Sequence, residues 1–190
     1  MMYFLDFDRA IFDTDAYNAS LADMPGCAEF REEILATIAK KRDETLTGGA
    51  GRSATWDKVS AAIKTGVLSF SPGQLEKFVY PDALEFLRGL GNEAVVVTYG
   101  EVSRQKVKVE SALANVVRVT VLYTDHQSKA EYLSTWPGYY GQEAVFVDDR
   151  VVELEGLAVR FPKLKLFEIR RDDKEGDGRF TVIRSFNELP

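Results

Sequence analysis

Four short apolar segments recur along the chain, and most of them end at polar residues. They are rich in Val, Leu and Phe and lack the strict polar alternation of a half-exposed strand, which is typical of strands buried on both faces of a parallel sheet. Residues 100–114 and 128–136 have helical character, so the pattern predicts a doubly wound, mainly parallel α/β sheet. The four segments are 3–5, closed by Asp6; 94–97, closed by Thr98; 116–122; and 144–147, closed by Asp148 and Asp149.

Residues 16–79 do not follow this alternation and are predicted to be helical. Because they stand between the first two strands, we expect a small helical cap over the carboxyl ends of the strands, with additional core packing as the alternative. The domain prediction is a core of residues 1–15 and 80–190 with a cap inserted at 16–79. The expected helices are 28–45, 54–65, a short one after 71–72, and 81–90, with a Gly-rich joint at 48–51.

The C-terminal segment has a different pattern. Residues 163–169 alternate polar and apolar side chains, residues 180–183 are mostly apolar, and the linker 171–178 between them is strongly polar. This arrangement predicts an edge strand or a hairpin with an exposed turn.

Composition narrows the function classes. The net charge is −6 over 190 residues, which lacks the basic footprint of a nucleic-acid binder or a polybasic membrane patch. One Cys and one His exclude an internal disulfide framework and a cysteine zinc site and weaken any histidine-centred mechanism. Chemistry is therefore expected from carboxylates, hydroxyls and lysine. With no leader sequence and no long apolar run visible, a cytoplasmic location is expected.

Two acidic pairs follow predicted strands. Asp6 and Asp8 are two residues apart, so one carboxylate can attack while the other handles protons. With Asp148 and Asp149 they form an oxygen-rich set suited to Mg²⁺. Taken singly, each feature has a structural alternative: solvated or helix-capping acids, a capping hydroxyl at Thr98, and a solvated helix lysine at residue 129.

The order of these features resembles the haloacid dehalogenase superfamily. The chain offers Asp-x-Asp after the first strand, a hydroxyl after the second, a lysine at a helix start, and Asp-Asp after a later strand. Four motifs in this order span most of the chain and are far more specific than any one of them. The matching segments are residues 3–14, 95–98, 128–133 around Lys129, and 145–150, with Glu153 and the helix at 80–87 as further points of similarity.

The resemblance implies a phosphatase mechanism. Asp6 would attack phosphorus and form an aspartyl-phosphate, and Asp8 would protonate the leaving group and then activate water. Thr98 would bind a phosphoryl oxygen and Lys129 would balance charge. Mg²⁺ would be held by Asp6, the backbone carbonyl of Asp8, and Asp148 with Asp149.

Two residues depart from the family pattern. Arg9 stands where a glycine is usual and could reach a substrate anion, and Ala10 stands where Thr or Val is usual. The halo-acid branch lacks an acidic residue at the position of Asp8, so phosphoryl transfer is favoured. The alternative encouraged by Ala10 is a catalytically silent relative that binds a phosphorylated ligand or a partner protein.

The substrate is expected to be a small phosphorylated metabolite. A cap leaves little room for a macromolecule, and the negative charge does not attract nucleic acid. Arg52 and Lys58, near the Gly-rich joint, are candidate contacts to the leaving group.

Overall fold

The computed structural model describes residues 1–44, 54–90, 93–116, 119–137, 143–172 and 174–190. They form a six-stranded sheet in the order β3-β2-β1-β4-β5-β6, with every neighbouring pair of strands parallel. The doubly wound α/β fold is therefore confirmed. The strands are β1 (Met2–Asp6), β2 (Ala94–Thr98), β3 (Thr120–Tyr123), β4 (Ala144–Asp148), β5 (Lys165–Ile169) and β6 (Thr181–Ile183).

Two apolar layers cover the central strands, one on each face of the sheet. Consecutive side chains of a strand point to opposite faces, so Tyr3 and Leu5 join one core cluster while Phe4 joins the other. The first cluster also contains apolar residues of α4 (Pro81–Leu90) and α5 (Val102–Ala112). The second contains those of α6 (Lys129–Thr135) and α7 (Val151–Arg160). Burial on both faces explains why these strands read as uninterrupted apolar runs.

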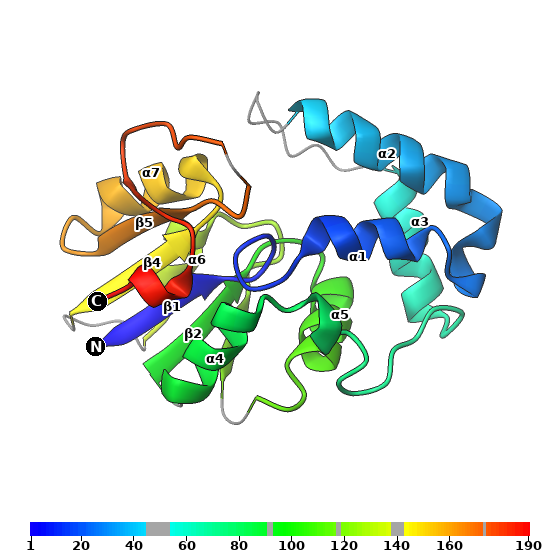
Figure 1. Cartoon of the computed structure of the whole chain (residues 1–190), viewed down its shortest axis with the longest axis horizontal. Helices are drawn as coiled ribbons and strands as arrows, with labels where there is room; N and C mark the ends of the chain where they lie inside the picture. The colour runs from blue at the N-terminus through cyan, green and yellow to red at the C-terminus, as the bar shows by residue number, and fades with distance from the viewer. Residues whose placement is uncertain (45–53, 91–92, 117–118, 138–142, 173) are drawn as a thin grey trace.

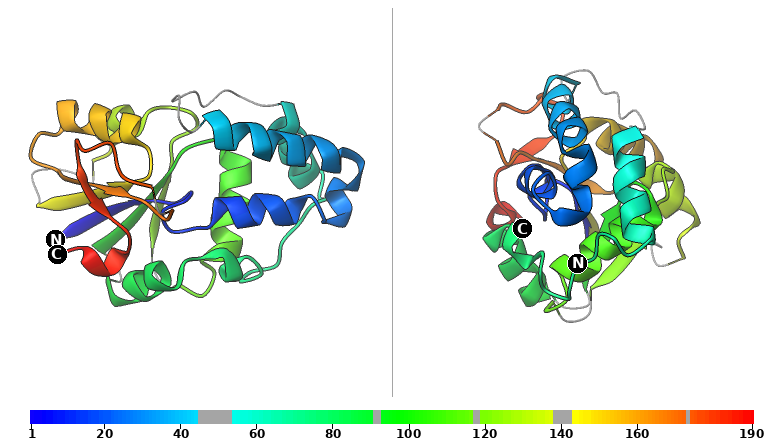
Figure 2. Two further views of the ribbon diagram at one scale, coloured as in Figure 1. Left: turned by 45° about the horizontal axis from the view of Figure 1, so that its top comes forward. Right: turned by 90° about the vertical axis from the view of Figure 1, so that its right-hand side faces the viewer.

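The helices between Thr14 and Lys64 lie beyond the carboxyl ends of the strands, and both chain termini lie at the opposite end of the sheet (Figures 1 and 2). Helix α3 packs against α2 of this group and against α5, which follows β2. The division into a core and a cap at residues 16–79 stays a prediction. The elements are α1 (Thr14–Leu21), the 3₁₀ helix η1 (Pro25–Phe30), α2 (Arg31–Glu44) and α3 (Ala54–Lys64).

Two local predictions are corrected. The hairpin alternative for the C-terminal segment is wrong, because β5 and β6 pair in parallel with Phe167 opposite Thr181. The polar linker is thus a crossover rather than a turn, and β6 is the edge strand. The short helix expected after residues 71–72 is a turn followed by the 3₁₀ helix η2 (Glu76–Phe78); a last 3₁₀ helix, η4 (Phe186–Glu188), closes the chain. No helix in the described ranges is long and apolar enough to cross a membrane.

Candidate active site

A buried lysine links the carboxyl ends of the two central strands. Asp6 ends β1 and Asp148 ends β4, and the register that pairs Leu5 with Val147 places the two aspartates side by side. The Lys129 ammonium donates to Asp6 Oδ1 and to Asp148 Oδ2, the latter at 2.7 Å. Burial opposes the charged lysine, but Asp148 and Asp6 together raise its pKa above the ordinary value. The structure therefore brings together three of the residues that the sequence singled out, Asp6, Lys129 and Asp148.

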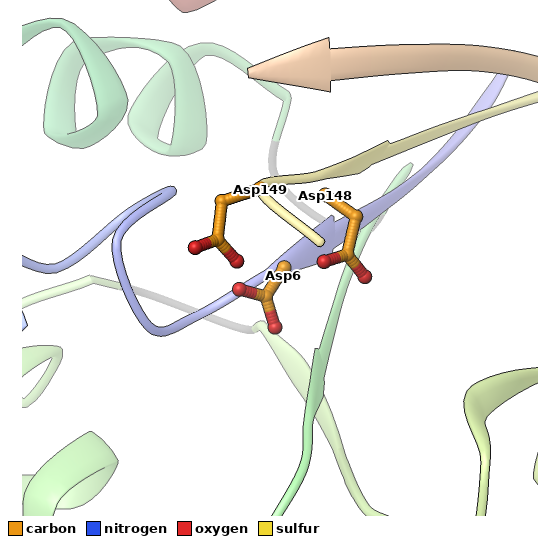
Figure 3. A group of neighbouring side chains, drawn as sticks. All are labelled: Asp6, Asp148 and Asp149. Atoms are coloured by element: carbon orange, nitrogen blue, oxygen red, sulfur yellow. The ribbon is translucent and has the colours of Figure 1, made fainter. Parts of the chain in front are cut away.

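Asp149 completes an acidic cluster with Asp6 and Asp148. Each of the three offers a carboxylate oxygen within 4.8 Å of the others, and the side chains point toward one another (Figure 3). Burial, reinforced by the negative charge of Asp148, raises the pKa of Asp149 to about 7. The pKa of Asp6 is also raised, mainly by burial, although Lys129 opposes the shift. A divalent cation would relieve this repulsion, so the donor set fits Mg²⁺.

The position of Lys129 follows from its place at the start of α6. The Ser128 side chain caps this helix by accepting a hydrogen bond from Glu131 N. The Lys129 backbone N–H donates to Glu153 Oε2 at 3.0 Å, so Glu153 from α7 anchors the lysine through its main chain. The same carboxylate accepts a hydrogen bond from Arg150. Glu153 thus supports Lys129 without being part of the cluster of Asp6, Asp148 and Asp149.

Thr98 carries a buried hydroxyl at the end of β2. Its register position is one residue beyond Val97, which pairs with Asp6 on the neighbouring strand. The side chain is fully buried, and within the described part of the chain its Oγ1 has no hydrogen-bond partner. A buried hydroxyl without a partner is costly and calls for an explanation. A ligand oxygen at the strand ends would supply one.

The Asp8 carboxylate is held by three donors. Thr14 Oγ1 and the Lys108 ammonium donate to Oδ1, and Gln105 Nε2 donates to Oδ2 at 2.8 Å. Burial opposes ionisation of this carboxyl, but the charge of Lys108 and the hydrogen bonds hold its pKa well below the ordinary value. Asp8 therefore has surroundings unlike those of Asp6, whose pKa is raised.

Sequence reasoning missed Lys108 and Gln105. Both belong to the buried face of α5, where Gln105, Lys108, Val109 and Ala112 follow one another at helical spacing. A polar residue and a lysine in an otherwise apolar stripe were the available signal, because such groups are buried only when they have partners.

The loop after β1 has an unusual backbone at Arg9. Its φ of 61° lies in the left-handed region, which explains in physical terms why the family pattern has a glycine there. The Arg9 side chain donates to Asp15 at 2.9 Å. Burial opposes the charge of the guanidinium, but the hydrogen bond to Asp15 and the charge of Asp15 raise its pKa, with smaller contributions from Asp149 and Asp8. Arg9 thus lies within the electrostatic reach of the acidic cluster.

Ala10 is buried in the first core cluster, and its backbone carbonyl accepts hydrogen bonds from a distant arginine. Arg171 donates from Nε and Nη2 to the Ala10 carbonyl oxygen, at 3.0 and 2.8 Å. The same guanidinium pairs with Asp82 of α4 and lies over the rings of Tyr80 and Phe186. Arg171, which follows β5, therefore anchors the loop after β1 at Ala10, the residue that departs from the family pattern.

Arg52 and Lys58 are the two residues of the predicted cap that are expected to contact the leaving group, and the structure describes only Lys58. Arg52 and the Gly-rich joint lie outside the described residues. Lys58 is an exposed residue of α3 that pairs with Glu33 of α2. This surface ion pair gives Lys58 a partner within the helical segment, and its contact to a leaving group stays a prediction.

Comparison with known proteins identifies the fold. No family model matches the sequence, and no relative is found among curated proteins. Solved structures are similar over nearly the whole chain. They include a putative haloacid dehalogenase-like hydrolase from Burkholderia xenovorans, with 20% identity, a TM-score of 0.63, and coverage of 99% of this chain and 94% of that one.

Two further structures extend the likeness. The putative HAD-hydrolase YfnB from Bacillus subtilis, bound to magnesium, has 16% identity and a TM-score of 0.64, covering 99% of this chain and 96% of that one. A dehalogenase solved with an intermediate complex has 16% identity and a TM-score of 0.62, covering 99% and 94%. The resemblance predicted from four ordered motifs is thus confirmed by structure: the chain has the fold of the haloacid dehalogenase-like hydrolases.

Proposed function

We propose that the protein is a Mg²⁺-dependent hydrolase of a small phosphorylated metabolite and that it works through an aspartyl-phosphate at Asp6. The observation that carries the proposal is the convergence of the Asp6 carboxylate with Lys129, Asp148 and Asp149 at one end of the sheet. Ligands of open α/β sheets bind at this end. The fold neighbours include putative hydrolases and a dehalogenase, and they support hydrolytic chemistry for this fold.

The reaction divides between two carboxylates. Asp8 is ionised in the free enzyme, because, against the effect of burial, Lys108 and the hydrogen bonds lower its pKa, and it takes up a proton from solvent when the phosphate dianion binds beside it. An Asp6 oxygen then attacks phosphorus while the bond to the leaving-group oxygen breaks, and that oxygen takes the proton from Asp8. Water then attacks the phosphorus of the aspartyl-phosphate and gives a proton back to Asp8, which releases phosphate and free Asp6. Lys129 balances the charge on Asp6 throughout, and Thr98 donates to a phosphoryl oxygen.

The metal would be held by Asp6, Asp149 and the backbone carbonyl of Asp8. Both oxygens of Asp148 already accept hydrogen bonds, Oδ1 from Arg150 N and Oδ2 from Lys129, so Asp149 is the better candidate for direct ligation. A bound Mg²⁺ supplies charge neutralisation at the phosphoryl group and the nucleophile. The raised pKa of Asp149, caused mainly by burial, fits a carboxylate whose charge has yet to be compensated.

Removing the metal is expected to stop the reaction. Turnover of p-nitrophenyl phosphate should be lost in excess EDTA and return when Mg²⁺ is added beyond the chelator. The reason is that two or three neighbouring carboxylates repel a phosphate dianion unless a cation lies between them. Continued turnover in EDTA at the original rate would contradict the ligand roles given to Asp6 and Asp149.

Replacing Thr98 by valine separates catalysis from stability. The two side chains have the same shape, and the Thr98 hydroxyl is buried without a partner in the described chain. The free energy of unfolding is therefore expected to stay the same or to rise by about 1 kcal/mol. If the hydroxyl binds a phosphoryl oxygen, kcat/KM should fall about 100-fold.

Thr124→Val is the matched control. Thr124 follows β3 and also carries a buried hydroxyl without a partner in the described ranges. Denaturant unfolding gives the free energy of unfolding of both variants, and steady-state kinetics give their kcat/KM. An equal loss of activity in the two variants would remove Thr98 from the phosphate-binding group.

The substrate class follows from the surroundings of the strand ends. Helices α1, α2 and α3 lie beyond this end of the sheet (Figure 2), which favours a small substrate over a macromolecule. Arg9 is proposed to contact a substrate anion. A panel of phosphorylated sugars, nucleotides and amino acids assayed with Mg²⁺ tests the assignment, and a halo-acid in the same panel tests the dehalogenase alternative.

A further inference from the structure

Lys108 occupies an enclosed position next to Asp8. Its side chain is only 6% exposed, and its ammonium pairs with Asp8 Oδ1. The nitrogen lies 5.4 Å, 5.5 Å and 5.8 Å from the ring centroids of Phe7, Phe12 and Tyr17. A buried ammonium requires a counter-charge, and here the counter-charge is a proposed catalytic carboxylate.

The aromatic rings limit where the Lys108 ammonium can lie, next to Asp8. Phe7 and Phe12 belong to the same loop as Asp8, and their rings stack at 4.9 Å. Backbone hydrogen bonds from Ile11 and Phe12 to the Phe7 carbonyl close this loop. Lys108 therefore packs against aromatic rings of the loop that carries Asp8. Its ion pair with Asp8 restrains where the carboxylate lies and also keeps it ionised.

Gln105 restrains the second oxygen of Asp8. It lies one helical turn before Lys108 on α5, and its Nε2 donates to Asp8 Oδ2 and to the Tyr99 carbonyl oxygen, both at 2.8 Å. With one carboxylate oxygen bonded to Lys108 and the other to Gln105, rotation of the carboxylate plane is blocked. Two residues of one helix thus set the orientation of Asp8.

We propose that Lys108, assisted by Gln105, is a positioning residue that orients Asp8 for proton transfer to the leaving group and from water. This inference rests on the proposed function, because it assigns Lys108 a role that is exerted only through Asp8. A misplaced proton carrier costs about 100-fold in rate, so Lys108→Met is expected to lower kcat by about that factor. KM should change little, since the proposed role of Lys108 is exerted through Asp8.

The test is a double-mutant cycle in steady-state turnover of p-nitrophenyl phosphate with Mg²⁺. The variants are Lys108→Met, Asp8→Asn and the combination, and Lys106→Met is the matched control. Lys106 is an exposed lysine of the same helix that pairs with Glu110. If Lys108 acts through Asp8, the double variant should be no slower than Asp8→Asn alone. Lys106→Met should keep the wild-type kcat.

Each other outcome has a distinct meaning. A wild type without any turnover would overturn the proposed function and this inference together. An active wild type with unchanged kcat in Lys108→Met, or with the same fold-loss in the Asp8→Asn background, would overturn the inference alone. If circular dichroism shows that Lys108→Met does not fold, Gln105→Leu replaces it in the same double-mutant cycle with Asp8→Asn. The expected result there is about a 10-fold loss of kcat that disappears when Asp8 is already asparagine.

Discussion

Turnover is expected to vanish when Asp6 is replaced by asparagine, while the fold stays intact. Asparagine has nearly the shape of aspartate but lacks a nucleophilic oxygen, and loss of a covalent nucleophile can lower kcat on the order of a million-fold. Burial raises the pKa of Asp6 although the charge of Lys129 opposes the shift, and repulsion from Asp148 and Asp149 raises it further. Removing its charge relieves that repulsion, so the thermal midpoint should not fall. The measurement is steady-state release of p-nitrophenol with Mg²⁺.

Asp23→Asn provides the control for Asp6→Asn. Asp23 is an exposed carboxylate that pairs with Arg31, so its loss should leave kcat at the wild-type level. Wild-type turnover by Asp6→Asn would show that covalent catalysis at Asp6 is wrong, whatever the other variants do.

Replacing Asp8 by asparagine is expected to separate the two halves of the reaction. A good leaving group such as p-nitrophenolate needs little protonation, so the first transfer to Asp6 should still proceed. Hydrolysis of the aspartyl-phosphate should then slow by about 100-fold to 10,000-fold, because the attacking water lacks its base. Rapid-mixing kinetics should therefore record one fast burst of p-nitrophenol followed by a slow steady state.

The burst distinguishes Asp8 from Asp6. Asp6→Asn should give neither a burst nor a steady state, since no phosphoryl group can be accepted. A linear time course without a burst in Asp8→Asn, at a rate close to that of the wild type, would remove Asp8 from the hydrolysis step.

Much of the fold could be predicted because the strands are buried on both faces. Residues 94–97 lie alternately in the two core clusters, one on each face of the sheet, so all four are apolar. Thr98 follows them directly at the site. Parallel pairing brings strand ends to one edge, so residues far apart in sequence could be placed together. The direction of β6 could not be predicted, because a three-residue strand carries no signal that separates a hairpin from a crossover.

The surroundings of Asp8 show where sequence reasoning ended. The Asp-x-Asp spacing identified two carboxylates but not their different environments. Asp6 forms an ion pair with Lys129 at the start of α6, whereas Asp8 forms one with Lys108 inside α5. Lys129 belongs to an ordered motif, whereas the sequence signal for Lys108 is only its place in the apolar stripe of α5, among three lysine and arginine residues within residues 104–108. Its pairing with Asp8 is seen only in the packed structure.

The most direct test of the account is to trap the covalent intermediate. Asp8→Asn is mixed with p-nitrophenyl phosphate and Mg²⁺, quenched in acid during the burst, digested and examined by mass spectrometry. The account predicts one added phosphoryl group on the peptide that contains Asp6, and its absence when Asp6 is also asparagine. Turnover by Asp8→Asn without phosphorylated Asp6, or with the phosphoryl group on another residue, would contradict it.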